Sequence, residues 1–130
     1  MAFSANAPIA ADGATEYLSE GKAQVALVRD RFERAILESV KGAAVDGTGA
    51  ARIPNTSSLS FEGIESPAAF LLLHRHRICC SAESACRTGS QEASYVLCAM
   101  DSAGDCARRT LRFSFGRFNT DTQIAIAYAK

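Results

Sequence analysis

Three cysteines lie close together in residues 78–89, which read Ile-Cys-Cys-Ser-Ala-Glu-Ser-Ala-Cys-Arg-Thr-Gly. The apolar start of this segment predicts a buried strand over residues 78–81, and the small polar residues after it predict an exposed loop. Cys86 lies in that loop beside Arg87, and a neighbouring cation lowers the pKa of a thiol and favours the nucleophilic thiolate. Cysteine is also a common small apolar residue of protein cores. Both interpretations of Cys86 stay open at this point.

A zinc site is a second interpretation of this region, because His74 and His76 precede the cysteines. Adjacent residues of a strand point to opposite faces, so Cys79 and Cys80 cannot easily bind one ion. The spacing also matches none of the paired patterns typical of structural zinc sites. We therefore predict no metal here and place both histidines at the end of a helix. The two remaining cysteines are assigned to packing: Cys98 and Cys106.

Arg112 differs from the surface arginines because it lies inside a strand predicted over residues 110–115. Strand alternation places Leu111, Phe113 and Phe115 on one face and Arg112 on the other. An arginine that is buried or half-buried there needs an anionic partner. That partner is either an internal carboxylate, in an ion pair, or a substrate carboxylate bound through two parallel hydrogen bonds.

The elements that must position these residues begin with a helical pattern over residues 14–40. Gly21 divides this pattern into a short first helix and a longer second helix. Its apolar residues recur at steps of three and four: Val25, Val28, Phe32, Ile36 and Val40. Its charged residues are predicted to form a solvated face: Arg29, Asp30, Arg31, Glu33 and Arg34.

The rest of the chain alternates short strands with short helices. A loop over residues 42–54 precedes a half-buried strand, Thr56–Phe61, in which Leu59 and Phe61 share a face. Ser66 and Pro67 then mark the start of a short buried helix over residues 68–76. Further helices are expected over residues 91–100, after Ser90, and from a Thr120 cap to Tyr128, with a turn over 101–106 between them. This alternation favours an α+β domain with helices on one face of a small, mostly antiparallel sheet.

Composition narrows the class of protein. The chain has 130 residues, 48% of them hydrophobic, and 14 basic residues balance 14 acidic ones. A chain of this size and charge is expected to form one globular domain with no affinity for nucleic acid or membranes. We divide it into an irregular lead-in (residues 1–12) and a domain (residues 13–130). The N-terminal residues show no signal-peptide pattern, and the odd number of cysteines argues against a disulfide framework, so we expect a cytoplasmic protein.

Two motifs now show a resemblance to a known family. Residues 81–86, followed by Thr-Gly-Ser-Gln-Glu-Ala-Ser-Tyr-Val-Leu at 88–97, resemble the catalytic loop of cysteine desulfurases, SSGSACxSGSxEPSxVL. Residues 111–118 resemble their IRFSLGRF segment, and residues 119–127 resemble the start of the following helix. Upstream, residues 52–61 resemble the RLPNTLNVSF strand, and Asn-Ala-Pro at 6–8 resembles a segment before the long helix. The resemblance is strongest to the nitrogen-fixation type.

The resemblance implies the C-terminal small domain of a pyridoxal-phosphate enzyme with the aminotransferase-like fold. In that family a loop cysteine takes sulfur from L-cysteine as a persulfide and passes it to iron–sulfur cluster assembly or another acceptor. Cys86 matches this nucleophile, and Arg112 matches the arginine that binds the substrate carboxylate. A sulfur-acceptor or scaffold protein and a cofactor-bearing large domain or second subunit are the implied partners.

The chain departs from the family in the residues that hold the cofactor. A Schiff base with pyridoxal phosphate needs a lysine, and Lys22, Lys41 and Lys130 all lie outside the family's Ser-x-His-Lys context, which belongs to a large domain absent from this chain. The chain also has Glu83, Cys98 and Arg108 where the family usually has other residues. We expect the chain alone to bind no cofactor and to be inactive. The alternatives are a non-enzymatic persulfide carrier or interaction module, or a decayed fragment of the same fold.

Overall fold

A computed structural model describes residues 12–15, 21–82, 94–100 and 108–128 of the chain. Within these residues three strands form one antiparallel sheet in the order β1-β2-β3: β1 (Ala43–Val45), β2 (Thr56–Phe61) and β3 (Thr110–Ser114). Four helices accompany the sheet: α2 (Lys22–Ser39), α3 (Ser66–Arg75), α4 (Tyr95–Met100) and α5 (Asp121–Tyr128). The architecture is the predicted α+β class.

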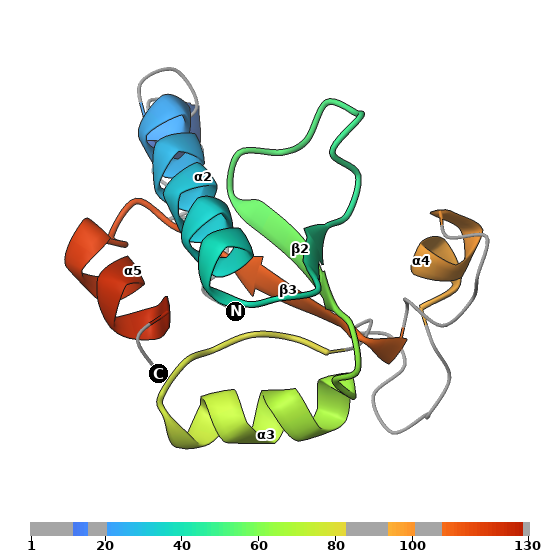
Figure 1. The fold of residues 1–130 in the computed structure, drawn as a ribbon. Coiled ribbons are helices and arrows are strands. Elements are labelled where there is room, and N and C mark those ends of the chain that lie inside the picture. Colours follow the sequence, from blue (N-terminus) through green and yellow to red (C-terminus); the bar gives the residue numbers. More distant parts are fainter. Residues whose placement is uncertain (1–11, 16–20, 83–93, 101–107, 129–130) are drawn as a thin grey trace, which may run out of the picture.

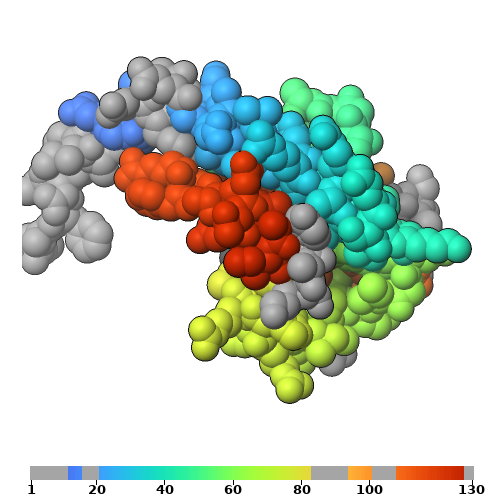
Figure 2. All heavy atoms as spheres, turned by 60° about the vertical axis from the view of Figure 1, so that its left-hand side comes forward, coloured from blue at the N-terminus to red at the C-terminus, as the bar shows by residue number. Residues whose placement is uncertain are grey.

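The helices lie on both sides of the sheet. Figure 1 shows α2 and α5 on one side of the strands, with α3 below them and α4 on the opposite side. In the space-filling view α5 lies directly against α2 (Figure 2). The prediction that helices cover one face is correct for α2, α3 and α5, while α4 lies apart from them.

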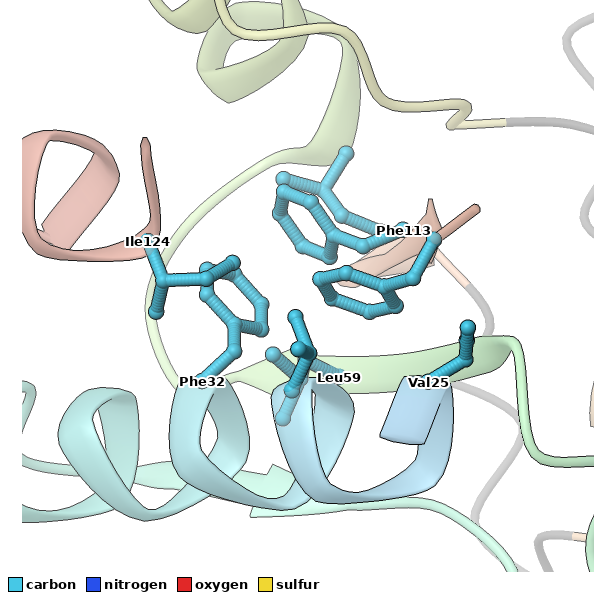
Figure 3. Packing of buried hydrophobic residues seen from close by; sticks show 8 residues of the cluster. Val25, Phe32, Leu59, Phe113 and Ile124 are labelled. Carbon is cyan, nitrogen blue, oxygen red and sulfur yellow. The ribbon is translucent and has the colours of Figure 1, made fainter. Parts of the chain in front are cut away.

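The core is the layer between α2 and the sheet. Figure 3 shows Val25 and Phe32 of α2 pointing toward Leu59 of β2 and Phe113 of β3, with Ile124 of α5 closing one end. The ring of Phe32 lies 4.9 Å from that of Phe113 and 5.4 Å from that of Phe115, measured between centroids. These tilted arrangements are favourable for aromatic pairs. The predicted apolar stripe of the long helix and the predicted inner face of the last strand therefore meet.

Two charged residues of α2 are buried, which corrects the prediction of a fully solvated charged face. Arg29 is 8% exposed and Glu33 is 7% exposed. The Glu33 carboxylate accepts two hydrogen bonds from the Arg52 guanidinium, at 2.7 and 2.9 Å, and Arg29 Nη1 donates to the Ile53 carbonyl at 2.7 Å. The hydrogen bond with Glu33 raises the pKa of Arg52. These contacts fix the chain that leads into β2 against α2.

The region around α3 also differs from the sequence-based prediction. The helix is not buried: Leu71 and Leu72 are 62% and 58% exposed, and within α3 only Ser66 is fully buried. Its N-cap is Glu65 rather than Ser66. The Ser66 hydroxyl instead donates to the carbonyl of Arg108 at 2.7 Å, so it ties the helix to the chain before β3. His74 and His76 lie in the last turn and at the C-cap, as predicted.

The observed bounds of the other elements also differ from the predicted ones. The predicted loop over residues 42–54 contains β1, and the strand predicted over residues 78–81 is reduced to one bridge between Ser81 and Arg112. The helix predicted over residues 91–100 corresponds to α4, whose described part begins at Tyr95. Ser90, residues 91–93 and the turn predicted over residues 101–106 lie outside the described residues. β2 has the predicted bounds, β3 ends one residue early, and Gly21 lies at the N-cap of α2.

Candidate functional site

The face of the sheet opposite the core carries Arg112. Leu111 and Phe113 point into the core and are 1% and 7% exposed, so alternation along β3 turns Arg112 outward, where it is exposed. In the described part of the chain Arg112 takes part in none of the ion pairs, which join Arg29 to Asp30 and Glu33, Arg31 to Asp121, and Arg52 to Glu33. Arg112 is exposed rather than buried or half-buried, so burial alone does not demand an anionic partner for its guanidinium.

Arg112 lies between two serines, Ser58 of β2 and Ser81 at an isolated bridge outside the three strands. Ser58 of β2 is directly opposite Arg112 in the β2–β3 register. On the other side, the backbones of Ser81 and Arg112 exchange two hydrogen bonds of 2.8 and 2.9 Å. The Ser58 hydroxyl in turn donates to the Asp46 carboxylate at 2.7 Å. Sequence reasoning did not identify these neighbours, because strand alternation predicts the face of a residue but not the register that sets its cross-strand partners.

A cavity of about 260 Å³ lies over this face. Among the described residues, the polar lining combines one cation, Arg112, with hydroxyl-bearing side chains, and the apolar lining is Ala82, Val96 and Leu97. The hydroxyl-bearing residues are Ser58, Ser81, Ser94 and Thr110. One guanidinium among hydroxyl groups suits a small ligand that carries one carboxylate.

Cys86 lies outside the described residues, so the structure does not test its predicted role. The described residues on either side of its segment are Ala82 and Ser94, and both line the Arg112 cavity.

The other described cysteines differ in how exposed their side chains are. Cys79 is exposed, whereas Cys80 packs against the core, in agreement with the prediction that they point to opposite faces. Burial raises the pKa of the Cys80 thiol, with a smaller contribution from Cys79, and so disfavours its thiolate. Cys98 was assigned to packing but is exposed on α4, and Cys106 lies outside the described residues.

The described residues do not fit pyridoxal phosphate by themselves. The lysines among them are Lys22 and Lys41, which are exposed at the two ends of α2. Since α2 packs on the core face of the sheet, neither lysine lies among the residues that line the Arg112 cavity. The third lysine of the chain, Lys130, is outside the described residues.

A three-stranded antiparallel sheet with this helix order matches part of known aminotransferase-fold proteins. The chain superposes on a NifS-like protein from Rickettsia africae with a TM-score of 0.73 and 22% identity, covering 88% of this chain and 29% of that one. A second structure, titled NifS-like protein, gives a TM-score of 0.74 and 24% identity, covering 89% of this chain and 28% of that one. These likenesses establish the fold.

Sequence comparison finds relatives among the cysteine desulfurases. The chain is 40% identical over 116 residues to a cysteine desulfurase of Gluconacetobacter diazotrophicus and 40% identical over 116 residues to the cysteine desulfurase NifS of Azotobacter vinelandii. A cysteine desulfurase of Klebsiella pneumoniae is 39% identical over 104 residues. The first two matches cover 89% of this chain and 29% of each relative. No model of a protein family matches the chain.

The chain is therefore a homologue of the cysteine desulfurases and corresponds to their C-terminal small domain. It spans 29% of the length of these relatives. Within the described residues, none of the helices has the length and apolar character needed to cross a membrane. The division at residues 12 and 13 stays a prediction.

Proposed function

We propose that this chain is the sulfur-accepting domain of a cysteine desulfurase, with Cys86 as the acceptor and Arg112 as the group that binds the carboxylate of L-cysteine. The observation that carries the proposal is the 40% identity to cysteine desulfurases over 89% of the chain. The geometry supports it, because the residues that flank the Cys86 segment line the same cavity as Arg112.

In the absence of a cofactor-bearing partner, sulfur acceptance by the chain needs only a thiolate and a persulfide that takes the place of L-cysteine as the sulfur donor. The Cys86 thiolate attacks the outer sulfur of a persulfide, the sulfur–sulfur bond of the donor breaks, and a new sulfur–sulfur bond forms at Cys86. The donor leaves as a thiolate, so no external oxidant is required. The resulting persulfide would serve iron–sulfur cluster assembly or a related sulfur transfer.

The partner of this domain would be a chain or domain that holds pyridoxal phosphate, the cofactor that supplies the electron sink for cleaving the carbon–sulfur bond of L-cysteine when bound. The described lysines lie away from the cavity, so the chain is proposed to depend on that partner. The alternative is a persulfide carrier that keeps the fold but takes part in no cysteine cleavage. A soluble sulfur-acceptor or scaffold protein would receive the persulfide in either case, and we expect both to work in the cytoplasm.

The test is persulfide transfer to the purified chain. The chain is incubated with glutathione persulfide, alkylated and digested, and the peptides are searched by mass spectrometry for one additional sulfur atom. We expect this atom on Cys86, its loss in Cys86→Ser, and no change in Cys98→Ser, which removes another exposed thiol. Sulfur on Cys79 in the wild type, or transfer that persists in Cys86→Ser, would contradict the assignment. Alanine release from L-cysteine by the chain alone would contradict the need for a partner.

A further inference from the structure

We propose that the outer side of α3 is a self-association surface, on which two copies of this chain pair antiparallel about a two-fold axis. The partner is therefore a second copy of the same chain. This inference goes beyond the proposed function and does not rest on it, because it uses neither the Arg112 cavity nor Cys86.

The inner side of α3 packs on the rest of the domain, whereas its outer side is exposed. Ala69, Phe70 and Leu73 pack against the core. Leu71 and Leu72 of the same helix are 62% and 58% exposed. Figure 1 shows α3 at the lower edge of the molecule, with the other labelled elements on one side of it. In the described part of the chain, two adjacent leucines of α3 are thus left largely uncovered.

One row of exposed residues runs along the outer side of α3. Residues three or four positions apart lie on the same side of a helix. This spacing joins an acidic residue at the N-cap, two apolar residues in the middle and a basic residue in the last turn: Glu65, Ala68, Leu72 and Arg75. Within the described residues, the ion pairs of the chain include neither Glu65 nor Arg75. Both charges are therefore available to a partner.

This row is complementary to itself when its direction is reversed. In an antiparallel pair that crosses at the middle of the helix, Leu72 is opposite Ala68 of the second copy, so a large side chain meets a small one. Arg75 is then opposite Glu65 of the second copy, and the two-fold axis repeats both contacts. The antiparallel arrangement also brings each helix N-terminus toward the C-terminus of the other helix, which favours their macrodipoles. A second copy supplies the required order of charges by symmetry.

An apolar groove beside the row adds to the contact. It has a volume of about 310 Å³, and the residues of α2 and α3 that line it include Ile36, Val40, Ala68 and Leu72. Burial of apolar surface is the main driving force of association. A helix of 10 residues is about 15 Å long, so the contact is small beside the interfaces of stable dimers. We expect a weak, reversible dimer with a dissociation constant on the order of 100 µM.

Sedimentation velocity of the purified chain tests the pairing, over concentrations from about 10 µM to about 1 mM. A reductant is present, because Cys79 and Cys98 are exposed and could join copies through disulfides. We expect the weight-average sedimentation coefficient to rise with concentration from the monomer value toward that of a dimer. Leu72→Gln should raise the dissociation constant at least about tenfold, because it places a polar group in the centre of the contact. Leu27→Gln is the control, since it changes a leucine that is 50% exposed on α2, and should leave the constant unchanged.

Charge reversal tests the antiparallel register. Glu65→Arg and Arg75→Glu each place like charges opposite one another at both ends of the pair, so each alone should weaken self-association at least about tenfold. An equimolar mixture of the two variants should associate again, within about threefold of wild type, because both ends of the mixed pair then oppose unlike charges. Circular dichroism of each variant shows whether its helices are intact, and mixing would not rescue a variant that had lost its fold.

Sedimentation of wild type as a monomer over the whole range would overturn the proposal and leave this face to another protein, such as the cofactor-bearing partner. A dimer that Leu72→Gln leaves intact, or that neither charge reversal weakens, would overturn it too, because the copies would then meet elsewhere. Folded single variants whose mixture fails to associate would overturn the antiparallel register. None of these outcomes changes the expected transfer of sulfur to Cys86, so the two proposals fail separately.

Discussion

Arg77 has a backbone conformation that L-residues rarely adopt, with φ at 62°. It follows the C-cap of α3, where the Arg77 N–H donates to the His74 carbonyl and the Ile78 N–H donates to the Leu73 carbonyl, both at 2.9 Å. This pair of hydrogen bonds is the Schellman motif, which usually has glycine at the left-handed position. Leu73 and Ile78 occupy the two positions that are frequently apolar in this motif, and both pack against the core.

Replacing Arg77 with glycine should therefore stabilise the domain. The left-handed conformation costs a non-glycine residue about 1–2 kcal/mol, and the extra freedom of glycine in the unfolded chain offsets part of that. We expect Arg77→Gly to raise the free energy of unfolding by about 0.5 kcal/mol, measured by urea denaturation. Arg75→Gly, two residues earlier at the last position of α3, is the control and should lower it by about 1 kcal/mol. Destabilisation by both variants would contradict this account.

Single residues were predictable where one pattern decides their environment. The outward direction of Arg112 and the opposite faces of Cys79 and Cys80 follow from strand alternation alone. The burial of Arg29 and Glu33 does not follow from the pattern of their own helix. It depends on Arg52 and Ile53, which lie in a loop about twenty residues away and bring their own hydrogen-bonding groups. A helical pattern reports the polarity of a face but not what covers that face.

Among the elements, β1 shows how a loop composition can conceal a strand. Its three residues are followed by a turn region and preceded by Gly42, which adopts φ at 79°. The N–H of Glu62 donates to the Gly42 carbonyl at 2.9 Å, so the chain at Gly42 runs close to the end of β2. Pairing with β2 stabilises this short strand, and nothing within its own three residues indicates it.

Gly42→Ala should consequently be costly, while another glycine of the same region should tolerate the change. A Cβ at Gly42 would lie 2.9 Å from the Cβ of Glu62, and the positive φ adds backbone strain. We expect a loss of about 2 kcal/mol in the free energy of unfolding, in the range for strained non-glycine residues. Gly49→Ala meets no atom within 4 Å and should be nearly neutral. Equal unfolding midpoints for the two variants in urea would argue against the β1–β2 geometry.

The elements that carry the candidate site also differ in how well their own sequence predicts them. β2 and β3 were predicted because each combines alternation with residues that favour strands. The segment over residues 78–81 has a similar apolar composition, yet its partner is a single position of β3. α3 was expected to be buried from its apolar content. Three consecutive leucines cannot indicate how wide the sheet beside them is, and in the described part of the chain that sheet has three strands.

At the scale of the whole molecule, the core sets the direction of the site. Phe113 packs against Phe32 on one face of β3, and Arg112 is consequently presented on the other. The sequence predicts these two faces separately. The register that brings Ser58 beside Arg112, and Asp46 beside Ser58, arises only when all three strands pair. Tertiary pairing therefore assembles the site from residues that carry no motif of their own.

Phe32 is the residue on which this arrangement depends most. Its ring packs against both Phe113 and Phe115 and is 3% exposed, so truncation removes both aromatic contacts between α2 and the chain at the end of the sheet. Phe→Ala substitutions in cores cost about 3–5 kcal/mol, and a domain of this size has about 5–15 kcal/mol of total stability. We expect Phe32→Ala to lower the urea midpoint severely or to abolish cooperative unfolding, as followed by circular dichroism.

Leu71→Ala is the matched control, because Leu71 is a large apolar residue that is 62% exposed on α3. Its unfolding midpoint should stay close to that of wild type, since surface substitutions usually change stability by less than about 0.5 kcal/mol. A normal midpoint for Phe32→Ala, or an equal loss in both variants, would mean that the packing of α2 on β3 does not hold the domain together. The outward direction of Arg112 would then need another cause, because it is this packing that commits the neighbouring positions of β3 to the core.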